Sequence, residues 1–193
     1  MDRTKGSSDR YKVAKLSTNK VVCNISFDSF PIEKVKFQNA QYEPHKMVEA
    51  YIDFDDFYIV AEGCRTKKFF ENIAKEPVQF MGGKKKGSKY GDAPESHIIK
   101  FNLGQDRKSV FITISVGKGR LGKTGLIIPD GAPDESISVP VSNITEFVKA
   151  ILYTEKMMDA YLVKMVNGLL VERDAEIKEA REKKKAEANT PAE

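Results

Sequence analysis

Residues 109–129 read SVFITISVGKGRLGKTGLIIP, and this stretch decides between two different folds. Within it, Gly117–Thr124 matches the phosphate-loop pattern G-x-x-x-x-G-K-[ST] and follows the strand-like residues Ser109–Val116. A phosphate loop works only where it opens a helix, because the free N–H groups of the helix then point at the phosphates. The next residues here are Gly125, an apolar β-favouring triplet and Pro129, all of which oppose a helix. The stretch therefore predicts two strands joined by a basic, glycine-rich hairpin.

The second half of the chain continues this strand pattern and ends in a helix. Four strands are predicted from alternating apolar residues or β-favouring composition: His97–Leu103, Ser109–Val116, Gly125–Ile128 and Ser136–Val139. Ser142-Asn143 with Glu146 is a helix-capping signature. The apolar residues from Ile144 to Met165 then follow a period of 3.6, which predicts a helix with one buried face.

The first half shows the same order of elements. Strands are predicted at Lys20–Phe27, Glu33–Tyr42, Met47–Phe54 and Asp56–Glu62, and a helix over Thr66–Lys75 that stops before Pro77. The residues predicted to point inward are Cys23, Ile25, Phe27, Val35, Phe37, Val48, Ala50, Ile52, Phe54, Phe57, Ile59 and Ala61, and in the second half Ile99, Phe101, Leu103, Val110, Ile112, Ile114 and Val116. The sequence thus predicts an α+β fold of two tandem β-β-β-β-α repeats that form antiparallel sheets packed with helices.

The chain of 193 residues is long enough for one well-buried domain. Residues 1–19 are polar and predicted to be a disordered arm, and residues 20–170 are predicted to form the domain. Its repeats span about 20–76 and 96–166, with a basic linker at 82–95. Residues 171–193 have a highly charged composition that predicts an exposed helical tail, fraying at its end.

The positive charge is concentrated in the middle of the chain. From residue 84 to residue 123, ten residues are basic: Lys84, Lys85, Lys86, Lys89, Lys100, Arg107, Lys108, Lys118, Arg120 and Lys123. Three are acidic, namely Asp92, Glu95 and Asp106. A basic excess among β-strands suits a polyanion-binding surface, because each neutralised phosphate releases counterions. The alternative is a solvated lysine cluster that only adds solubility.

This repeated order of elements, with a basic second half, resembles Whirly-type and positive-cofactor-four-type single-stranded nucleic-acid-binding proteins. The resemblance covers roughly residues 20–166 and rests on element order. It implies two antiparallel sheets packed together, helices that cover the core or mediate oligomer contacts, and strands and hairpins that bind unpaired bases and backbone. The plant motif Lys-Gly-Lys-Ala-Ala-Leu is absent, and Gly83–Gly87 is similar to it only in composition. Phage or bacterial relatives are therefore the more natural comparison.

The faces opposite the apolar ones are expected to carry polar, basic and aromatic residues: Lys34, Lys36, Gln38, Tyr42, Tyr51, Tyr58, Lys100, Asn102, Phe111, Thr113 and Ser115. Phe111 lies among Thr and Ser on a face predicted to be solvated. A base that stacks on such a ring gains about 1–3 kcal/mol without sequence preference. The alternative for Tyr51, Tyr58 and Phe111 is packing against a helix or a second sheet, as large aromatic side chains commonly do.

Together these observations predict a nonenzymatic protein that binds single-stranded nucleic acid, with DNA the first candidate and RNA open. Binding would use backbone charge and base stacking with little sequence specificity, and the resemblance implies a homo-oligomer. The predicted contact residues are Lys34, Lys36, Lys84, Lys85, Lys86, Lys89, Lys100, Arg107, Lys108, Phe111, Lys118, Arg120 and Lys123. The location expected for such a protein is cytoplasmic or nucleoid-associated.

Other kinds of site have little support in the residues. Asp53, Asp55 and Asp56 could form a metal or general-base cluster, since Asp53 and Asp55 would share one side of a strand, but no His or Glu partner has a recognisable spacing. Cys23 and Cys64 lack metal-ligand spacing and read as small apolar core residues. Neither a cofactor nor a metal is predicted, and the apolar runs fall far short of the roughly 20 residues that span a bilayer.

Two other functions remain open at this point. The first is a nucleotide-hydrolysing enzyme built on Gly117–Thr124, which would require a helix beginning near Lys123. The second is an assembly module without nucleic acid, which would use the apolar face of the helix over Ile144–Met165.

Overall fold

The computed structural model describes the backbone of residues 11–188 and the side chains of residues 11–179. Within these residues, the first sheet has the strand order β1 (Lys12–Ser17), β2 (Val21–Ser26), β3 (Lys34–Gln41) and β4 (Lys46–Asp53). The second has the order β5 (Val78–Lys84), β6 (Glu95–Leu103), β7 (Val110–Leu121) and β8 (Ile127–Pro129), with β9 (Glu135–Val141) paired to β7. The helices are α1 (Phe54–Arg65), α2 (Lys68–Ile73) and α3 (Ile144–Ala188), and the 3₁₀ turn η2 (Phe30–Ile32) joins β2 to β3.

All neighbouring strands in both sheets are antiparallel. The predicted α+β class, with two antiparallel sheets and helices after each, is confirmed. Both sheets, α1, α2 and the start of α3 belong to one unit that ends at Met157, and the rest of α3 forms a second unit. No helix in the described part of the chain is both long and apolar enough to cross a membrane.

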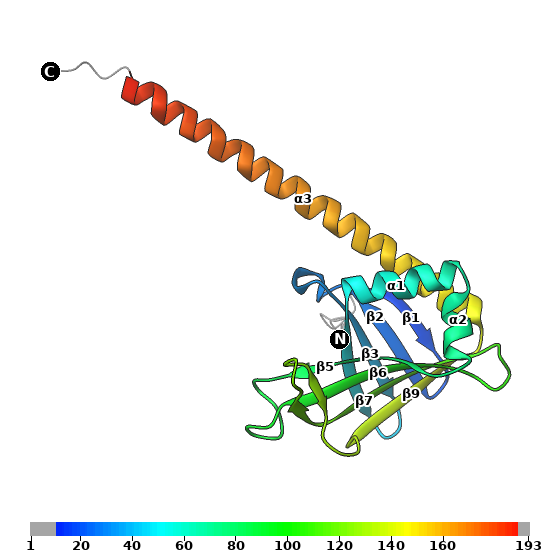
Figure 1. Cartoon of the computed structure of the whole chain (residues 1–193). Helices are drawn as coiled ribbons and strands as arrows, with labels where there is room; N and C mark the ends of the chain where they lie inside the picture. Colours follow the sequence, from blue (N-terminus) through cyan, green and yellow to red (C-terminus); the bar gives the residue numbers. More distant parts are fainter. Residues whose placement is uncertain (1–10, 189–193) are drawn as a thin grey trace, which may run out of the picture. The chain divides into compact units, whose positions relative to one another are not determined.

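The core lies where the apolar faces of the two sheets meet. Figure 1 shows the strands of the two sheets running in different directions. Phe37 of the first sheet lies 6.0 Å from Phe101 of the second, and the Phe69 ring from α2 stacks on Phe147 from α3 at 5.8 Å. The predicted inward residues that are buried in the strands and at the start of α1 are Cys23, Ile25, Val35, Phe37, Val48, Ala50, Ile52, Phe54, Ile99, Phe101, Val110, Ile112, Ile114 and Val116. Phe27 and Leu103, also predicted to point inward, are only half-buried. Each large apolar side chain that is buried contributes about 1.5–3 kcal/mol.

One buried polar side chain joins the two sheets across this apolar interface. Asn39 of β3 donates from Nδ2 to the carbonyl oxygens of Ile112, at 2.8 Å, and Ile137, at 2.9 Å. Those carbonyls belong to β7 and β9. Because a buried amide needs partners, Asn39 fixes how the first sheet is placed on the second.

The prediction of a strand at Asp56–Glu62 is wrong, because these residues lie in α1. Phe57, Val60, Ala61 and Cys64 are buried at helical spacing, whereas Ile59 is 70% exposed. The alternation of Phe57, Ile59 and Ala61 fits a strand over this short run, and only the longer run to Cys64 shows the helical period. Asp55 and Asp56 lie in the first helical turn, where carboxylates interact favourably with the helix dipole.

The fourth strand of the first sheet is instead β1, in the arm predicted to be disordered. β1 pairs with β2 from Lys12↔Ser26 to Ser17↔Val22. Only Leu16 of β1 is buried, so the strand depends on its hydrogen bonds to β2 more than on an apolar face of its own. Residues 1–10 of the predicted arm lie outside the described residues.

β5 was also not predicted. It covers Val78–Lys84 and so includes the first part of the linker expected at 82–95. The strand pairs with β6 along its full length, from Val78↔Phe101 to Lys84↔Glu95. The strand is difficult to predict from the sequence, because the adjacent glycines Gly82 and Gly83 indicate a turn.

α3 begins at the predicted cap, where the Asn143 side chain accepts a hydrogen bond from the Thr145 backbone N–H at 2.8 Å. The helix continues without a break through the region expected to be a charged tail, as far as Ala188. Residues 189–193, predicted to fray, lie outside the described residues.

The Asn39 bridge gives a stability test. Replacing Asn39 with Ala removes two hydrogen bonds inside the core, so the free energy of unfolding should fall by about 1–3 kcal/mol. The matched control is Gln41→Ala, on the same strand, whose amide donates to the nearby Glu43 carbonyl and does not join the two sheets in the described part of the chain. Urea unfolding of both variants measures the difference. Equal stability of the two variants would contradict the role assigned to Asn39.

Candidate nucleic-acid interface

The second sheet has one face in the core and one face outside it. The outer face of the second sheet consists of Gln79, Met81, Ile98, Lys100, Asn102, Phe111, Thr113, Ser115, Ser136, Ser138 and Pro140. On β6, β7 and β9, the residues that alternate with them, such as Ile99, Ile112 and Val139, are buried, whereas Val78 and Phe80 on β5 are half-buried. The outer face is half-buried to exposed along β5, β6, β7 and β9.

The register places the outer-face residues in rows across the sheet. Lys100 lies between Gln79 and Thr113 in one row, and Phe111 lies between Asn102 and Pro140 in another. Hydroxyl pairs join β7 to β9, with Thr113 bonded to Ser138 and Ser115 to Ser136, each at 2.9 Å. The short serine and threonine side chains leave space above the sheet beside the larger side chains of Phe111 and Lys100.

Two predicted contact residues, Arg107 and Lys108, lie at the end of the sheet nearest Phe111. The turn that carries them is held by Asp106, whose carboxylate accepts from the backbone N–H groups of Lys108 and Ser109 at 3.0 Å each. These hydrogen bonds hold the pKa of Asp106 below its usual range, the one from Lys108 most of all. Neither basic side chain forms a salt bridge within the described residues.

The opposite end of the sheet carries the other basic residues of the second half. Lys84 lies 3.9 Å from Glu95, Lys89 lies 2.8 Å from Glu135, and Lys118 lies 3.6 Å from Asp130. Within the part of the chain that the structure describes, four further cations at this end have no salt bridge, namely Lys85, Lys86, Arg120 and Lys123. All four side chains are exposed: Lys85 and Lys86 lie in the β5–β6 loop, Arg120 near the end of β7, and Lys123 in the β7–β8 turn.

The glycine-rich match to a phosphate loop lies mostly inside β7. That strand runs to Leu121, and the chain turns back into β8 with no helix before α3 at Ile144. The backbone N–H of Gly119 donates to the Pro94 carbonyl, and that of Gly122 to the Leu126 carbonyl, both at 2.8 Å. A Cβ on Gly119 would lie 2.8 Å from the Ile127 side chain. This glycine therefore serves strand packing, and its N–H is not free to hold a phosphate.

The two contact residues predicted on the first sheet are in a different electrostatic setting. Lys34 forms a salt bridge with Asp53, and Lys36 lies 3.0 Å from Glu49 and 3.4 Å from Asp28. Glu49 also accepts a hydrogen bond from the Tyr51 hydroxyl. Burial, and then the charge of Glu49, raise the pKa of Tyr51 to about 12. Carboxylates thus balance the charge of this face, and Tyr58, expected beside it, lies on α1.

His97 and Glu95 form a buried pair between the sheets. His97 Nε2 lies 2.5 Å from the Glu95 carboxylate, and Nδ1 lies 2.7 Å from the backbone carbonyl oxygen of Glu49 in β4. His97 is 4% exposed, and both of its ring nitrogens are engaged. Burial alone would raise the pKa of Glu95, but the hydrogen bond and charge of His97 outweigh it and lower that pKa. This geometry suits a structural link and leaves no ring nitrogen for proton transfer.

The aspartates considered as a metal site begin a helix. Asp53 is the residue before α1, and Asp55 and Asp56 lie in its first turn. Among the described residues, no group of three or more His, Cys, Asp or Glu side chains is placed to hold a metal ion. Cys23 and Cys64 are buried free thiols, and burial raises the pKa of Cys64 to about 12.

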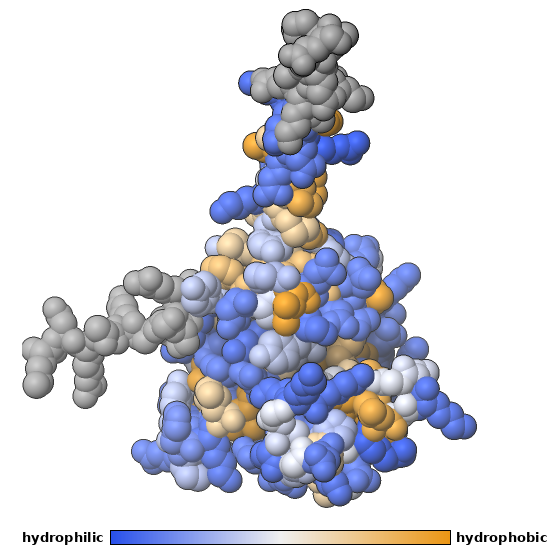
Figure 2. Space-filling model, turned by 90° about the vertical axis from the view of Figure 1, so that its left-hand side faces the viewer, coloured by the Kyte–Doolittle hydropathy of each residue, from blue (hydrophilic) through white to orange (hydrophobic). Residues whose placement is uncertain are grey.

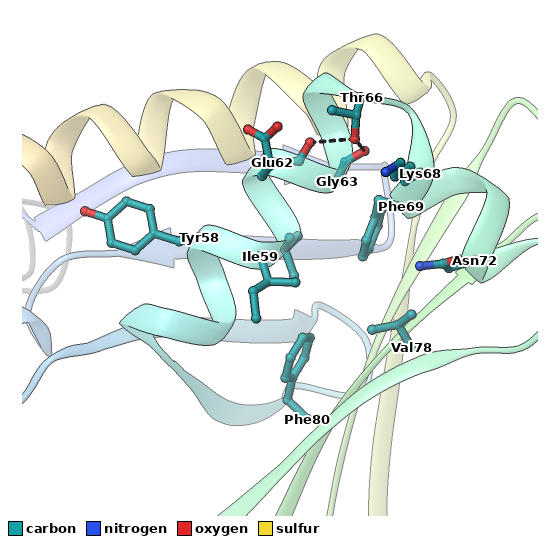
Figure 3. Close-up of a pocket in the computed structure, with 11 residues that line it drawn as sticks. Tyr58, Ile59, Glu62, Gly63, Thr66, Lys68, Phe69, Asn72, Val78 and Phe80 are labelled. Carbon is teal, nitrogen blue, oxygen red and sulfur yellow. Dashed lines mark hydrogen bonds between the residues drawn. The ribbon is translucent and has the colours of Figure 1, made fainter.

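An apolar hollow of about 530 Å³ lies between α1, α2 and β5. Figure 3 shows Ile59 of α1 and Phe80 of β5 on facing sides of it, with Phe69 and Val78 close by. Its polar groups include Glu62, but none of the predicted contact residues lines it. Figure 2 shows that hydrophilic side chains cover much of one side of the molecule, with hydrophobic patches between them.

Sequence reasoning did not single out Tyr90 as a candidate contact residue. It lies in the β5–β6 loop, and its hydroxyl bonds the Asp134 carboxylate before β9. The only available signal was an aromatic residue directly after a lysine, in a segment that looked like a flexible linker.

Neither a family model nor a curated protein matches this chain. Among solved structures, the plant transcriptional regulator PBF-2 is similar over 78% of this chain and 92% of its own, with 14% identity and a TM-score of 0.48. WHY3 from Arabidopsis thaliana is similar over 81% of this chain and 95% of its own, with 12% identity and a TM-score of 0.43.

The lowered pKa of Glu95 predicts an acid-dependent loss of stability. Because the folded-state pKa lies below the ordinary value of 4.5, Glu95 stabilises the fold above pH 4.5, and this contribution is lost as the pH falls through the folded-state pKa. Glu95→Gln should therefore unfold more easily at neutral pH but lose less further stability on acidification. Urea unfolding across the acid range measures both. An unchanged acid dependence in the variant would contradict this assignment.

Proposed function

We propose that the protein binds single-stranded nucleic acid, DNA in the first instance, on the outer face of the second sheet and the basic loops at its two ends. Binding involves no catalysis. The phosphates contact Lys100 on the face and the basic side chains at the ends, and unpaired bases stack on Phe111. A cytoplasmic or nucleoid-associated location follows from this proposal.

The distribution of salt bridges is the observation that carries the proposal. Lys34 and Lys36 on the first sheet face carboxylates, so a phosphate would have to displace existing partners. Lys100, Arg107 and Lys108 form no salt bridge within the described residues and surround the Phe111 end of the outer face. An unpaired cation can neutralise a phosphate without first losing a carboxylate, which favours the second sheet.

The shape and chemistry of the outer face favour unpaired bases over a duplex. From Phe111 to Gly117, β7 extends for about 20 Å, at roughly 3.3 Å for each residue. This length is enough for several nucleotides, and binding folds of this size contact about 4–16 of them. The Phe111 ring can stack only on a base that is free of its partner strand. The serine and threonine hydroxyls offer hydrogen bonds that do not depend on one particular base.

The nucleotide-hydrolase alternative has lost its main support. It needs a helix that begins near Lys123, whereas β7 extends through Leu121 and β8 follows it. The N–H groups of Gly119 and Gly122 already donate to backbone carbonyls. Nucleic-acid phosphates can still reach Arg120 and Lys123, whose side chains form no salt bridge in the described part of the chain.

The predicted homo-oligomer has its own support in the second unit. Within that unit, α3 carries a run of apolar side chains that are about half exposed or more, namely Val163, Val166, Leu169, Leu170 and Val171. Exposed apolar runs of this kind mark protein interaction surfaces. We propose that this part of α3 joins copies of the chain, which also keeps open an assembly function independent of nucleic acid.

Charge removal on the two sheets tests the proposed interface. The double variant Lys100→Gln with Lys108→Gln should bind single-stranded DNA more weakly and lower the log-log salt slope by about 1.4, at about 0.7 for each lost phosphate contact. The matched control, Lys34→Gln with Lys36→Gln, removes the same charge and should leave the slope nearly unchanged. Fluorescence anisotropy over a salt series, with single-stranded and duplex probes, measures these effects. Equal losses in both variants, or a preference for the duplex, would count against the interface.

The α3 surface makes a separate prediction. Leu169→Ser with Leu170→Ser should shift the protein to a smaller assembly in sedimentation velocity, because less apolar surface is buried between copies. Ile59→Ser is the control, since Ile59 is 70% exposed on α1. A wild-type protein that sediments as a monomer would refute the assembly role.

A further inference from the structure

Acidic side chains occupy the cationic end of the outer face. The β8–β9 connection, residues 130–134, and the first residue of β9, Glu135, together supply three carboxylates, those of Asp130, Asp134 and Glu135. Glu135 lies 2.8 Å from Lys89, Asp130 lies 3.6 Å from Lys118, and Asp134 accepts a hydrogen bond from the Tyr90 hydroxyl. The bond to Glu135 raises the pKa of Lys89, so the ammonium form is favoured.

This contact lies beside the path proposed for nucleic acid. In β7, Gly117 has the same strand parity as Phe111, Thr113 and Ser115, so a Cβ there would point to the outer side. Such a Cβ would lie 3.4 Å from the backbone nitrogen of Asp134. Asp134, and with it the Tyr90 hydroxyl, therefore lies at the end of the outer face opposite Phe111.

Lys89 and Tyr90 together have the chemistry of a nucleotide-binding position. The Lys89 ammonium lies 5.4 Å from the centre of the Tyr90 ring, so a cation and an aromatic surface are available side by side. A phosphate can take the place of the Glu135 carboxylate on Lys89, because both are oxygen anions. A base can stack on the ring once the Tyr90 hydroxyl leaves Asp134.

We propose that Lys89 and Tyr90 form a second nucleotide-binding position, which Asp134 and Glu135 hold closed until nucleic acid displaces them. This proposal rests on the function proposed above. The contact is easy to displace, since both members of the Lys89–Glu135 pair are about 40% exposed and such surface pairs are weak. Asp134 and Glu135 then lower the affinity of this position for every anion. A long polyanion, which is also held at other contacts, displaces them more readily than a single small anion does.

Two substitutions at the same residue should have opposite effects. Tyr90→Phe keeps the ring and loses the bond to Asp134, so single-stranded DNA should bind roughly 1.5- to 5-fold more tightly. Tyr90→Leu loses the ring, so binding should weaken by roughly 5- to 150-fold. A purely structural role for Tyr90 would not produce this reversal of sign. Tyr42→Leu, at an exposed tyrosine in the β3–β4 turn, is the control for loss of an aromatic ring and should leave affinity unchanged.

The carboxylates are tested with a charge-matched pair of variants. Asp134→Asn with Glu135→Gln should tighten binding and steepen the salt slope by about 0.7, because Lys89 becomes free for one phosphate. Glu33→Gln with Glu43→Gln changes the net charge equally, at exposed sites outside the contact, and should give less than half of that gain.

Fluorescence anisotropy of a labelled oligothymidine, titrated with each full-length variant, measures the affinity in every case. A wild-type protein that binds, with Tyr90→Phe and the carboxylate variant no tighter than wild type, would overturn this inference alone. A wild-type protein that binds no oligonucleotide at low salt would overturn both this inference and the proposed function.

Discussion

The burial of one apolar face from each sheet is the constraint on which the other features depend. Phe37 and Phe101 meet across this contact, and Asn39 adds hydrogen bonds that fix one sheet on the other. Because side chains alternate along a strand, committing Ile112 and Ile114 to the core directs Phe111 and Thr113 to the outer face. The candidate interface is therefore a consequence of how the core is packed.

The carboxylates determine which cations are available on this scaffold. Asp53 and Glu49 neutralise lysines on the first sheet, whereas Lys100, Arg107 and Lys108 form no salt bridge within the described residues. The chain's net charge of +4 does not distinguish the paired lysines of the first sheet from the unpaired cations of the second, because it sums both groups. Lys89 is an intermediate case, because its partner is an exposed carboxylate that a phosphate can replace.

Much of the fold could be predicted from periodicity. The strands with clear alternation were placed correctly, apart from their ends, and Gly125 and Pro129 correctly predicted two strands joined by a hairpin in place of a helix. The predicted end of the first of these strands at Val116 was wrong, because β7 continues to Leu121. The errors came where local patterns were short or ambiguous. Phe57, Ile59 and Ala61 fit two periods, β1 has one buried residue, and Gly82-Gly83 obscured β5. Pairing with a neighbouring strand stabilises β1 and β5, and a single stretch of sequence does not show that pairing.

The candidate site was harder to predict than the fold. Composition identified the basic residues, and strand parity identified Phe111 as a residue of the outer face. The sequence could not show that Lys36 lies between Glu49 and Asp28, or that Tyr90 meets Asp134 across 44 residues of chain. Such pairings arise from tertiary packing, so the selection among equivalent lysines required the structure.

The most direct test is to map the binding surface by NMR, with isotope-labelled protein titrated with a short oligothymidine. If nucleic acid binds the outer face, chemical-shift changes should follow that face, centred on Lys100, Phe111 and Thr113, with little change at Lys34 and Lys36 on the first sheet. Changes confined to the first sheet, or to the apolar hollow beside Ile59, would contradict binding at the outer face.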